Sequence, residues 1–143
     1  MNAPAIRRPP LLLSRLDVER IEELLEQPRY RSLNTDALRG ELERAEVVEP
    51  ANVPADVITM NSIARVRVDD AELGRHEHEL VLVYPHDADG GAHKVSIFAP
   101  VGSALLGLRL GDAIDWPMPG GRTARLEVLA IRYQPEAAGE LHR

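Results

Sequence analysis

Residues 99 to 121 are dense in turn-forming residues, and this stretch limits what the chain can fold into. Pro100, Gly102, Gly107 and Gly111 interrupt a short apolar run. Proline fixes its own φ and disfavours helix at the residue before it, whereas glycine permits a left-handed backbone. The spacing predicts a short helix over 103–108, capped by Ser103, between a rigid loop at 99–103 and a following strand.

Alternation of apolar and polar residues predicts β-strands on both sides of this helix. The predicted strands cover 63–68, 76–84, 94–98, 113–116 and 124–133. Residues 85–92 include Asp87, Asp89, Gly90 and Gly91, which is a strong turn signal. The sequence therefore predicts a small antiparallel β domain with one short helix over about 55–139.

An amphipathic helix is predicted near the N-terminus. Ser14 is typical of an N-cap, and Asp17 falls at the third helical position, where a carboxylate faces free amides. Leu13 and Val18 occupy the two positions of a hydrophobic staple. Pro28 predicts the end of this helix, because the residue before proline is pushed out of the α region.

A second helix is predicted to begin after Asn34 or Thr35 and to carry Leu38, Leu42 and Ala45 on one face. Pro50 and Pro54 predict its end and a linker. Two short amphipathic helices with a brief connection usually pack antiparallel, so we expect a helical hairpin, a short coiled coil, over 14–48. The fold class is α+β, with a disordered lead-in at 1–13 and a tail at 140–143.

Charge and composition exclude several classes of function. The net charge of −6 disfavours direct binding to nucleic acid, and the absence of cysteine removes disulfides and thiolate chemistry. The apolar run at 11–13 is too short for a secretion signal, and no stretch approaches the ~18 apolar residues of a membrane span. We expect a cytoplasmic protein, monomeric by default, without a membrane partner.

Three stretches carry a resemblance to a known family. Residues 99–112 resemble the motif Ser/Ala-Pro-x-Gly-x-Ala-Leu-x-Gly-x-x-x-Gly-Asp in the C-terminal domain of the Gre transcript-cleavage factors. Residues 58–62 (Ile-Thr-Met-Asn-Ser) and 133–139 (Tyr-Gln-Pro-Glu-Ala-Ala-Gly) narrow the match to the regulators of nucleoside diphosphate kinase, a branch of the Gre superfamily. The resemblance covers about residues 13–139.

This resemblance implies an FKBP-like C-terminal domain and a bacterial RNA polymerase partner. The loop with Pro100, Val101, Gly102 and Ser103 would contact the rim of the polymerase secondary channel. The N-terminal hairpin would point into or over the channel mouth, so the protein would compete with Gre factors by steric exclusion. The implied activity is non-enzymatic transcription regulation, without a cofactor.

The predicted hairpin tip argues against transcript cleavage. Gre factors present paired carboxylates at the tip of a long coiled coil, where they hold a magnesium ion in the polymerase active site. The tip here carries Arg29, Arg31, Asn34 and Asp36, and Asp36 is its one carboxylate. The hairpin is also much shorter, so the sequence predicts no cleavage activity.

Two other functions stay open at this point. One is an interaction module that acts directly on nucleoside diphosphate kinase or another protein. The other is a prolyl isomerase, suggested by the FKBP-like fold alone. Isomerase pockets are lined by aromatic side chains, and this chain has one Trp, one Phe and three Tyr. Trp116 is as readily a core residue as a pocket residue.

Nucleotide and metal sites are not predicted. Residues 102–107 spell Gly-x-x-x-x-Gly, but Leu108 and Arg109 follow where a P-loop needs Lys and Ser/Thr. Residues His76, His78, His86, Asp87, Asp89 and His93 show no tight ligand spacing. We expect no metal.

Overall fold

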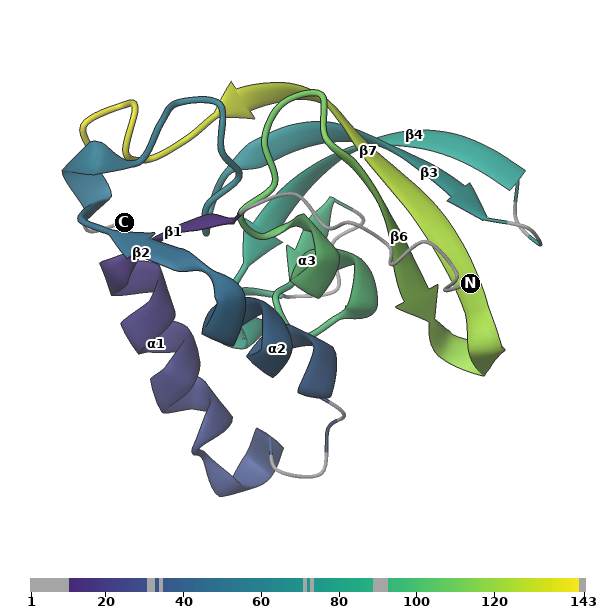
Figure 1. Ribbon diagram of the computed structural model, residues 1–143, viewed down its shortest axis with the longest axis horizontal. Coiled ribbons are helices and arrows are strands. Elements are labelled where there is room, and N and C mark those ends of the chain that lie inside the picture. Colours follow the sequence, from purple (N-terminus) through teal and green to yellow (C-terminus); the bar gives the residue numbers. More distant parts are fainter. Residues whose placement is uncertain are drawn as a thin grey trace, which may run out of the picture.

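A curved β-sheet wraps around one short helix, and two further helices lie to one side (Figure 1). The computed structural model of the 143-residue chain describes residues 11–30, 33, 35–70, 72, 74–88 and 93–141. The mixture of helices and a sheet confirms the predicted α+β class.

Five strands form the main sheet in the order β5-β4-β3-β7-β6. Their bounds are β3 Ile63–Asp70, β4 Gly74–Val83, β5 Lys94–Ser96, β6 Ala113–Met118 and β7 Arg122–Tyr133. The central strand β3 pairs antiparallel with both β4 and β7. Ala64 and Val66 are buried and Arg65 between them is exposed, which is the alternation that predicted this strand.

The sheet is not wholly antiparallel, which corrects the prediction for the strand near residue 95. Strand β5 pairs with β4 in parallel, with Leu82 opposite Val95. The chain leaves β4 through the 3-10 helix η3 (Pro85–Asp87). A parallel neighbour requires a crossover connection and cannot follow a tight hairpin turn. Asp89, Gly90 and Gly91 of the predicted turn lie outside the described residues.

The two predicted N-terminal helices are α1 (Arg15–Leu25) and α2 (Asp36–Arg44), and the 3-10 helix η1 (Pro28–Tyr30) lies between them. Ser14 caps α1 as predicted, because its Oγ accepts a hydrogen bond from the N–H of Asp17 (3.5 Å). Helix α1 ends before Pro28, also as predicted. Antiparallel coiled-coil packing of α1 and α2 stays a prediction.

Two short strands flank these helices and were not predicted. β1 (Leu12–Ser14) and β2 (Glu46–Val48) pair in parallel, with Leu13 opposite Val47. Helix α2 therefore ends at Arg44, well before Pro50. The alternation that predicted the strand near residue 95 runs over five residues, 94–98, whereas neither β1 nor β2 lies within an alternating run. This pair ties the start of α1 to the end of α2.

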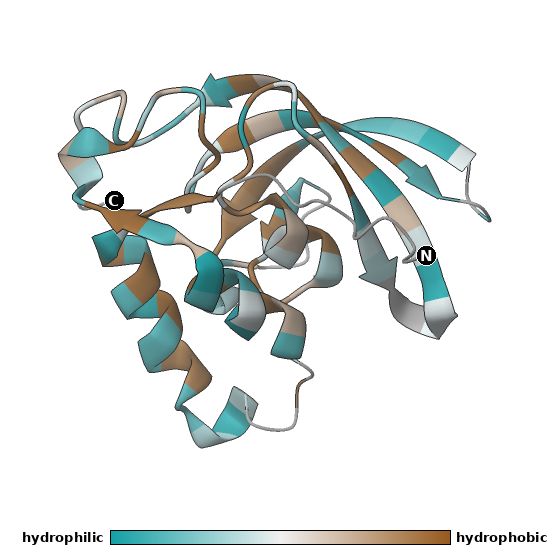
Figure 2. Ribbon diagram, in the orientation of Figure 1, coloured by the Kyte–Doolittle hydropathy of each residue, from teal (hydrophilic) through white to brown (hydrophobic). Residues whose placement is uncertain are grey.

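One hydrophobic core joins the N-terminal helices to the sheet. Ile21 of α1 and Leu38 of α2 belong to the same buried cluster as Val66 and Trp116 of the sheet. Helix α3 (Pro100–Leu105) lies inside the curve of the sheet and contributes Ala104 and Leu105 to that cluster. Figure 2 shows apolar residues on the inner sides of these elements and polar residues outside. The helices are thus held against the sheet.

The outer face of the sheet is polar. The guanidinium of Arg67 on β3 lies 3.4 Å from Glu77 on β4 and 3.1 Å from Glu127 on β7. The remaining short elements are the 3-10 helices η2 (Pro50–Asn52) and η4 (Pro119–Gly121). Within the described part of the chain, no helix has the length and apolarity needed to cross a membrane.

Candidate protein-binding surface

Two of the sequence motifs, residues 58–62 and 99–112, are joined by backbone hydrogen bonds just after α3. The N–H of Ile58 donates to the carbonyl of Leu108 (2.8 Å), and the N–H of Gly107 donates to the carbonyl of Ile58 (2.9 Å). Gly107 has a φ of +82°, and a Cβ there would lie 3.0 Å from the side chains of both Leu11 and Leu13. Glycine is therefore required for the turn and for the approach of β1.

The third motif, residues 133–139, holds the segment just before Ile58 through the side chain of Gln134. The side chain of Gln134 is buried, and its Nε2 donates to the carbonyls of Pro54 and Val57 at 2.7 Å each. Its Oε1 accepts from the N–H of Ala137 (3.1 Å). All three motifs thus make internal hydrogen bonds, which join the segment before β3 to the chain just after α3 and to the chain after β7.

The conformation predicted for residues 99–103 is wrong. Pro100–Leu105 form helix α3, so the predicted loop is the first turn of a helix that starts earlier than residue 103. Proline is favoured at the first helical position because its missing N–H has no helical partner there. Ser103 does not cap the helix; its Oγ donates to the carbonyl of Ile97 (2.7 Å).

Only two of the four residues predicted to bind polymerase present side chains to solvent. Pro100 is exposed and Val101 is half-buried. Gly102 is buried, and a Cβ on it would lie 2.0 Å from the carbonyl oxygen of Ser96. Ser103 is also buried. Gly102 and Ser103 therefore hold α3 against the preceding turn.

The predicted hairpin tip lies beside the start of α3. The ring of Tyr30 in η1 meets the ring of Phe98 edge to face, with centroids 4.9 Å apart. The guanidinium of Arg29 lies 4.9 Å from the centroid of the Tyr30 ring. Asp36 is exposed at the start of α2, while Arg31 and Asn34 lie outside the described residues.

The structure therefore brings parts of two separately predicted sites together. We call the combined region the tip–α3 surface and define it by six residues: Arg29, Tyr30, Leu33, Phe98, Pro100 and Val101. Leu33 is 46% exposed, and Val47 and Leu110 are exposed to a similar degree elsewhere in the described part of the chain. Sequence reasoning missed Tyr30 and Phe98, although the scarcity of aromatic residues in the chain was an available signal.

Asp17 occupies the third helical position of α1 as predicted, and its carboxylate accepts hydrogen bonds from groups outside the helix, just before β3 and just after β4. Its carboxylate accepts hydrogen bonds from the N–H of Met60 (3.1 Å) and the hydroxyl of Tyr84 (3.3 Å). Burial raises the pKa of Asp17 to about 7, and the nearby Glu136 carboxylate adds to this rise. Burial also raises the pKa of Tyr84 well above its usual value.

Other candidate chemistry finds little support in the geometry. Among the residues that the structure describes, no group of three His, Asp or Glu side chains is placed to hold a metal. The rings of His76 and His78 lie 6.0 Å apart and tilted. Trp116 is buried in the core at 1% exposure, so it lines no open isomerase pocket.

Comparison with known proteins connects the two halves of the chain to two family models. Residues 53–133 match the model "Transcription elongation factor, GreA/GreB, C-term", and residues 9–48 match the model "Rnk N-terminus". The regulator of nucleoside diphosphate kinase of Escherichia coli strain K12 is 48% identical over 135 residues, which are 93% of this chain and 96% of that protein. The chain belongs to the family of regulators of nucleoside diphosphate kinase.

Two further similar proteins are named as Gre-type transcription elongation factors. The transcription elongation factor GreA of Clostridium perfringens strain SM101 is 36% identical over 95 residues, 66% of this chain and 58% of that protein. The solved structure of a prokaryotic transcription elongation factor GreA/GreB from Nitrosomonas europaea has a TM-score of 0.67 and 48% identity, covering 88% of this chain and all of that one. The tip–α3 surface takes residues from both matched models.

Proposed function

We propose that this protein is a non-enzymatic transcription regulator that binds bacterial RNA polymerase near its secondary channel and competes there with Gre-type factors. Membership of the family and the Gre-type C-terminal half support the choice of partner. Because bacterial RNA polymerase is cytoplasmic, the proposal places the protein in the cytoplasm. We also propose that the sheet domain is FKBP-like.

The tip–α3 surface is the observation that carries this function. It combines exposed apolar side chains at Leu33 and Pro100 with a guanidinium at Arg29. The Tyr30–Phe98 contact and the buried turn under Gly102 fix its shape before any partner arrives. A pre-formed surface loses little conformational entropy on docking, which favours its use as a binding site.

Transcript cleavage is not part of the proposal. Within residues 27–36 the chain has one carboxylate, that of Asp36, where a pair would be needed to hold a catalytic magnesium ion. Asp36 also begins helix α2 and does not lie at the end of a long coiled coil. The protein would therefore occupy the channel mouth without supplying cleavage chemistry.

A competition assay on purified core RNA polymerase tests this function. Stalled elongation complexes are treated with a Gre factor and increasing amounts of the protein, and cleaved transcript is measured. We expect cleavage to fall as the protein is added, with none when the protein acts alone. Unchanged cleavage at saturating protein would overturn the proposal.

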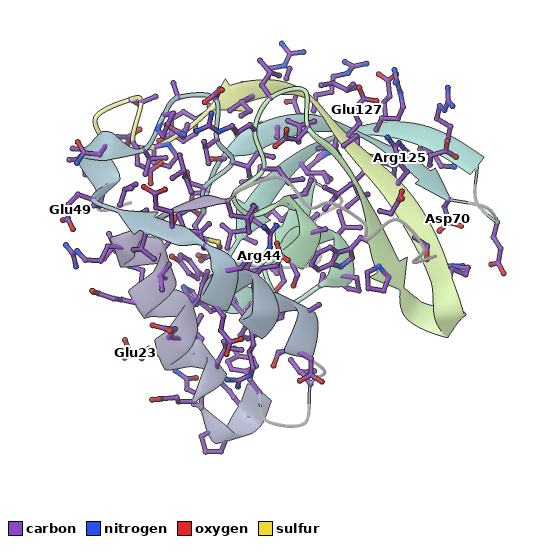
Figure 3. All side chains as sticks on the ribbon, viewed as in Figure 1. Glu23, Arg44, Glu49, Asp70, Arg125 and Glu127 are labelled. Carbon is purple, nitrogen blue, oxygen red and sulfur yellow. The ribbon has the colours of Figure 1, made fainter. Side chains whose placement is uncertain are left out.

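Two charge reversals locate the binding surface. Arg29→Glu alters the tip–α3 surface. Arg125→Glu makes the same charge change near the start of β7, where Arg125 pairs with Asp115 of β6 (Figure 3). Only Arg29→Glu is expected to weaken competition. Equal loss in both variants would mean that overall charge matters and that the surface is not the contact.

The second candidate function is direct action on nucleoside diphosphate kinase. The name of the Escherichia coli relative, regulator of nucleoside diphosphate kinase, favours it. Pull-down of purified kinase and of purified polymerase by the same immobilised protein separates the two candidates. Capture of the kinase without capture of polymerase would favour the second.

A further inference from the structure

Helices α1 and α2, with the strands β1 and β2 that flank them, form what we call the N-terminal unit, residues 11–48. Within this unit β1 pairs with β2, and the guanidinium of Arg39 on α2 donates to the carbonyl of Leu25 on α1 (3.3 Å). The boundary between the two matched family models falls at the end of the same unit. The chain therefore consists of this unit and the sheet domain, packed on one core.

Asp17 is a buried polar link between the N-terminal unit and the sheet domain. It lies in the first turn of α1 and is 4% exposed. One carboxylate oxygen accepts from the N–H of Met60 just before β3 (3.1 Å), and the other accepts from the hydroxyl of Tyr84 just after β4 (3.3 Å). The apolar residues Ile21 and Leu25 of α1 pack in the shared core and carry no charge. A pH-dependent contact between the two parts therefore involves Asp17.

A second carboxylate holds the same segment from the sheet domain. Glu136, which follows β7, accepts a hydrogen bond from Oγ1 of Thr59 (2.6 Å). Thr59 directly precedes Met60, so carboxylates from the two parts of the chain bond to consecutive residues. Repulsion between these like charges favours a proton on one of them. Burial favours protonation of Asp17, because Glu136 keeps partial contact with water.

The other charged and titratable groups around Asp17 come from α1 and from the chain after β4. The guanidinium of Arg20 lies 6.0 Å from the centroid of the Tyr84 ring and favours the ionised carboxylate of Asp17. The ring of His86 stacks on the ring of Tyr84. Residues 59–62 are Thr-Met-Asn-Ser and bring no ionisable side chain. Burial outweighs the effect of Arg20, and the pKa of Asp17 rises to about 7.

We propose that Asp17 is a proton-controlled latch that fastens the N-terminal unit to the sheet domain. When the carboxyl is protonated, one oxygen still accepts from Met60 and no charge is buried. When the carboxyl is ionised, separation of the unit returns the charge to water, so the separated state becomes more populated while the sheet domain stays folded. The tip–α3 surface takes residues from both parts, so separation disrupts it. Only the use of the latch in regulation rests on the proposed polymerase contact.

The direction of the pH effect follows from the two environments of Asp17. The carboxyl has a pKa of about 7 when the parts are together, and a pKa near 4 when it is exposed to water. The separated state therefore gains about tenfold in relative population for each pH unit between roughly 4 and 7, and gains little above 7. Acidification below pH 7 thus strengthens the attachment of the N-terminal unit.

Hydrogen exchange at the backbone amide of Met60 measures this separation in the full chain. The protection factor, which corrects for the intrinsic exchange rate, is followed by nuclear magnetic resonance from pH 5 to pH 8. We expect it to fall about 100-fold between pH 5 and pH 7 and then to level off. The amide of Asn61 is the internal control, because it donates to the carbonyl of Leu82 within the sheet domain (2.6 Å). Its protection should be roughly tenfold higher or more throughout, since it opens only when the sheet domain unfolds.

Two substitutions distinguish the latch from a purely structural contact. Asp17→Asn cannot ionise, so the protection of Met60 should no longer vary with pH. Glu136→Gln keeps an acceptor for Thr59 and removes the like charge, so the Met60 curve should level off at a lower pH and fall less in total. Glu43→Gln makes the same change of charge at an exposed residue of α2 and should match the parent.

Three results would contradict the latch. The first is a Met60 protection factor that is the same at pH 5 and pH 7. The second is equal protection of Met60 and Asn61, which would mean that the whole protein opens as one. The third is an unchanged pH dependence in Asp17→Asn, or in Glu136→Gln should Asp17→Asn fail to fold. None of these measurements involves polymerase, so the latch and the proposed function can fail independently.

Discussion

The carboxylate of Asp17, in the first turn of α1, accepts a hydrogen bond from the backbone N–H of Met60 across the junction between the helices and the sheet domain (3.1 Å). Asp17 is 4% exposed, and the hydroxyl of Tyr84 donates to its other oxygen (3.3 Å). Because the pKa of Asp17 is raised to about 7, chiefly by burial, the folded protein binds a proton here near neutral pH.

This raised pKa predicts that Asp17 stabilises the folded state more strongly as the pH falls. In the unfolded chain the carboxyl loses its proton near pH 4, while in the folded protein it does so near pH 7. The contribution is therefore fully present below about pH 4 and is lost as the pH rises through about 7. A rise of this size corresponds to roughly 4 kcal/mol between the two limits.

Urea unfolding of the parent and of Asp17→Asn at several pH values from 5 to 8 measures this contribution. Asparagine keeps an acceptor for Met60 and cannot ionise. The unfolding free energy of the parent minus that of the variant should increase steadily toward pH 5. Nearby Arg20 and Glu136 stay in both proteins, as do the surface carboxylates Glu49 and Glu77. A difference that is constant over this range would contradict the assignment.

Gly102→Ala should destabilise the protein through the turn under α3. A Cβ at this position would lie 2.0 Å from the carbonyl oxygen of Ser96, so helix and turn must move apart. We expect a loss of about 2–4 kcal/mol, the range of overpacked or strained core sites. Gly40→Ala in α2 is the matched control, since its Cβ would meet no atom within 4 Å. The control should gain about 0.5–1 kcal/mol from helix propensity and a restricted unfolded chain.

Gln134→Ala should remove the clamp on the segment before β3. The substitution leaves the carbonyls of Pro54 and Val57 without the Nε2 donor that lies 2.7 Å from each. Two acceptors that lose a buried donor predict a loss of about 2–4 kcal/mol in unfolding free energy. Gln27→Ala, at a half-buried residue two positions after α1 whose side chain accepts an exposed hydrogen bond from Arg29, should cost less than about 0.5 kcal/mol. Thermal and urea unfolding measure both variants. Similar losses of unfolding free energy would mean that the hydrogen bonds of Gln134 do not stabilise the segment before β3.

Local pattern was sufficient for most of the fold. Alternation around Val66 predicted the central strand, and Ser14 and Pro28 predicted both ends of α1, because each of these signals acts within one turn or one strand. The parallel pairing of β5 could not be read in this way. Strand direction depends on the path of the connecting loop, and the turn residues near Asp87 fit either a hairpin or a crossover.

The candidate site was predictable only in part, for a related reason. Pro100 was singled out correctly as an exposed residue, but its effect on the backbone was to begin a helix. The contacts of Tyr30 with Phe98 and of Asp17 with Met60 join residues far apart in the chain. Such pairs follow from tertiary packing, which spacing along the sequence does not encode.

The tip–α3 surface should behave as one unit in a double-mutant cycle on Tyr30 and Phe98. The edge-to-face contact, with centroids 4.9 Å apart, is the link between η1 and the turn before α3. Tyr30→Leu and Phe98→Leu keep apolar volume but remove the ring pair. We expect a coupling of about 0.5–1.5 kcal/mol in unfolding free energy, as for other aromatic pairs. The control cycle pairs Phe98→Leu with Tyr133→Leu at the end of β7, and it should be additive within about 0.5 kcal/mol. If the first cycle is additive as well, the ring contact does not hold η1 against the turn before α3. The surface would then become ordered only on binding its partner, and the entropy lost in that ordering would reduce the affinity.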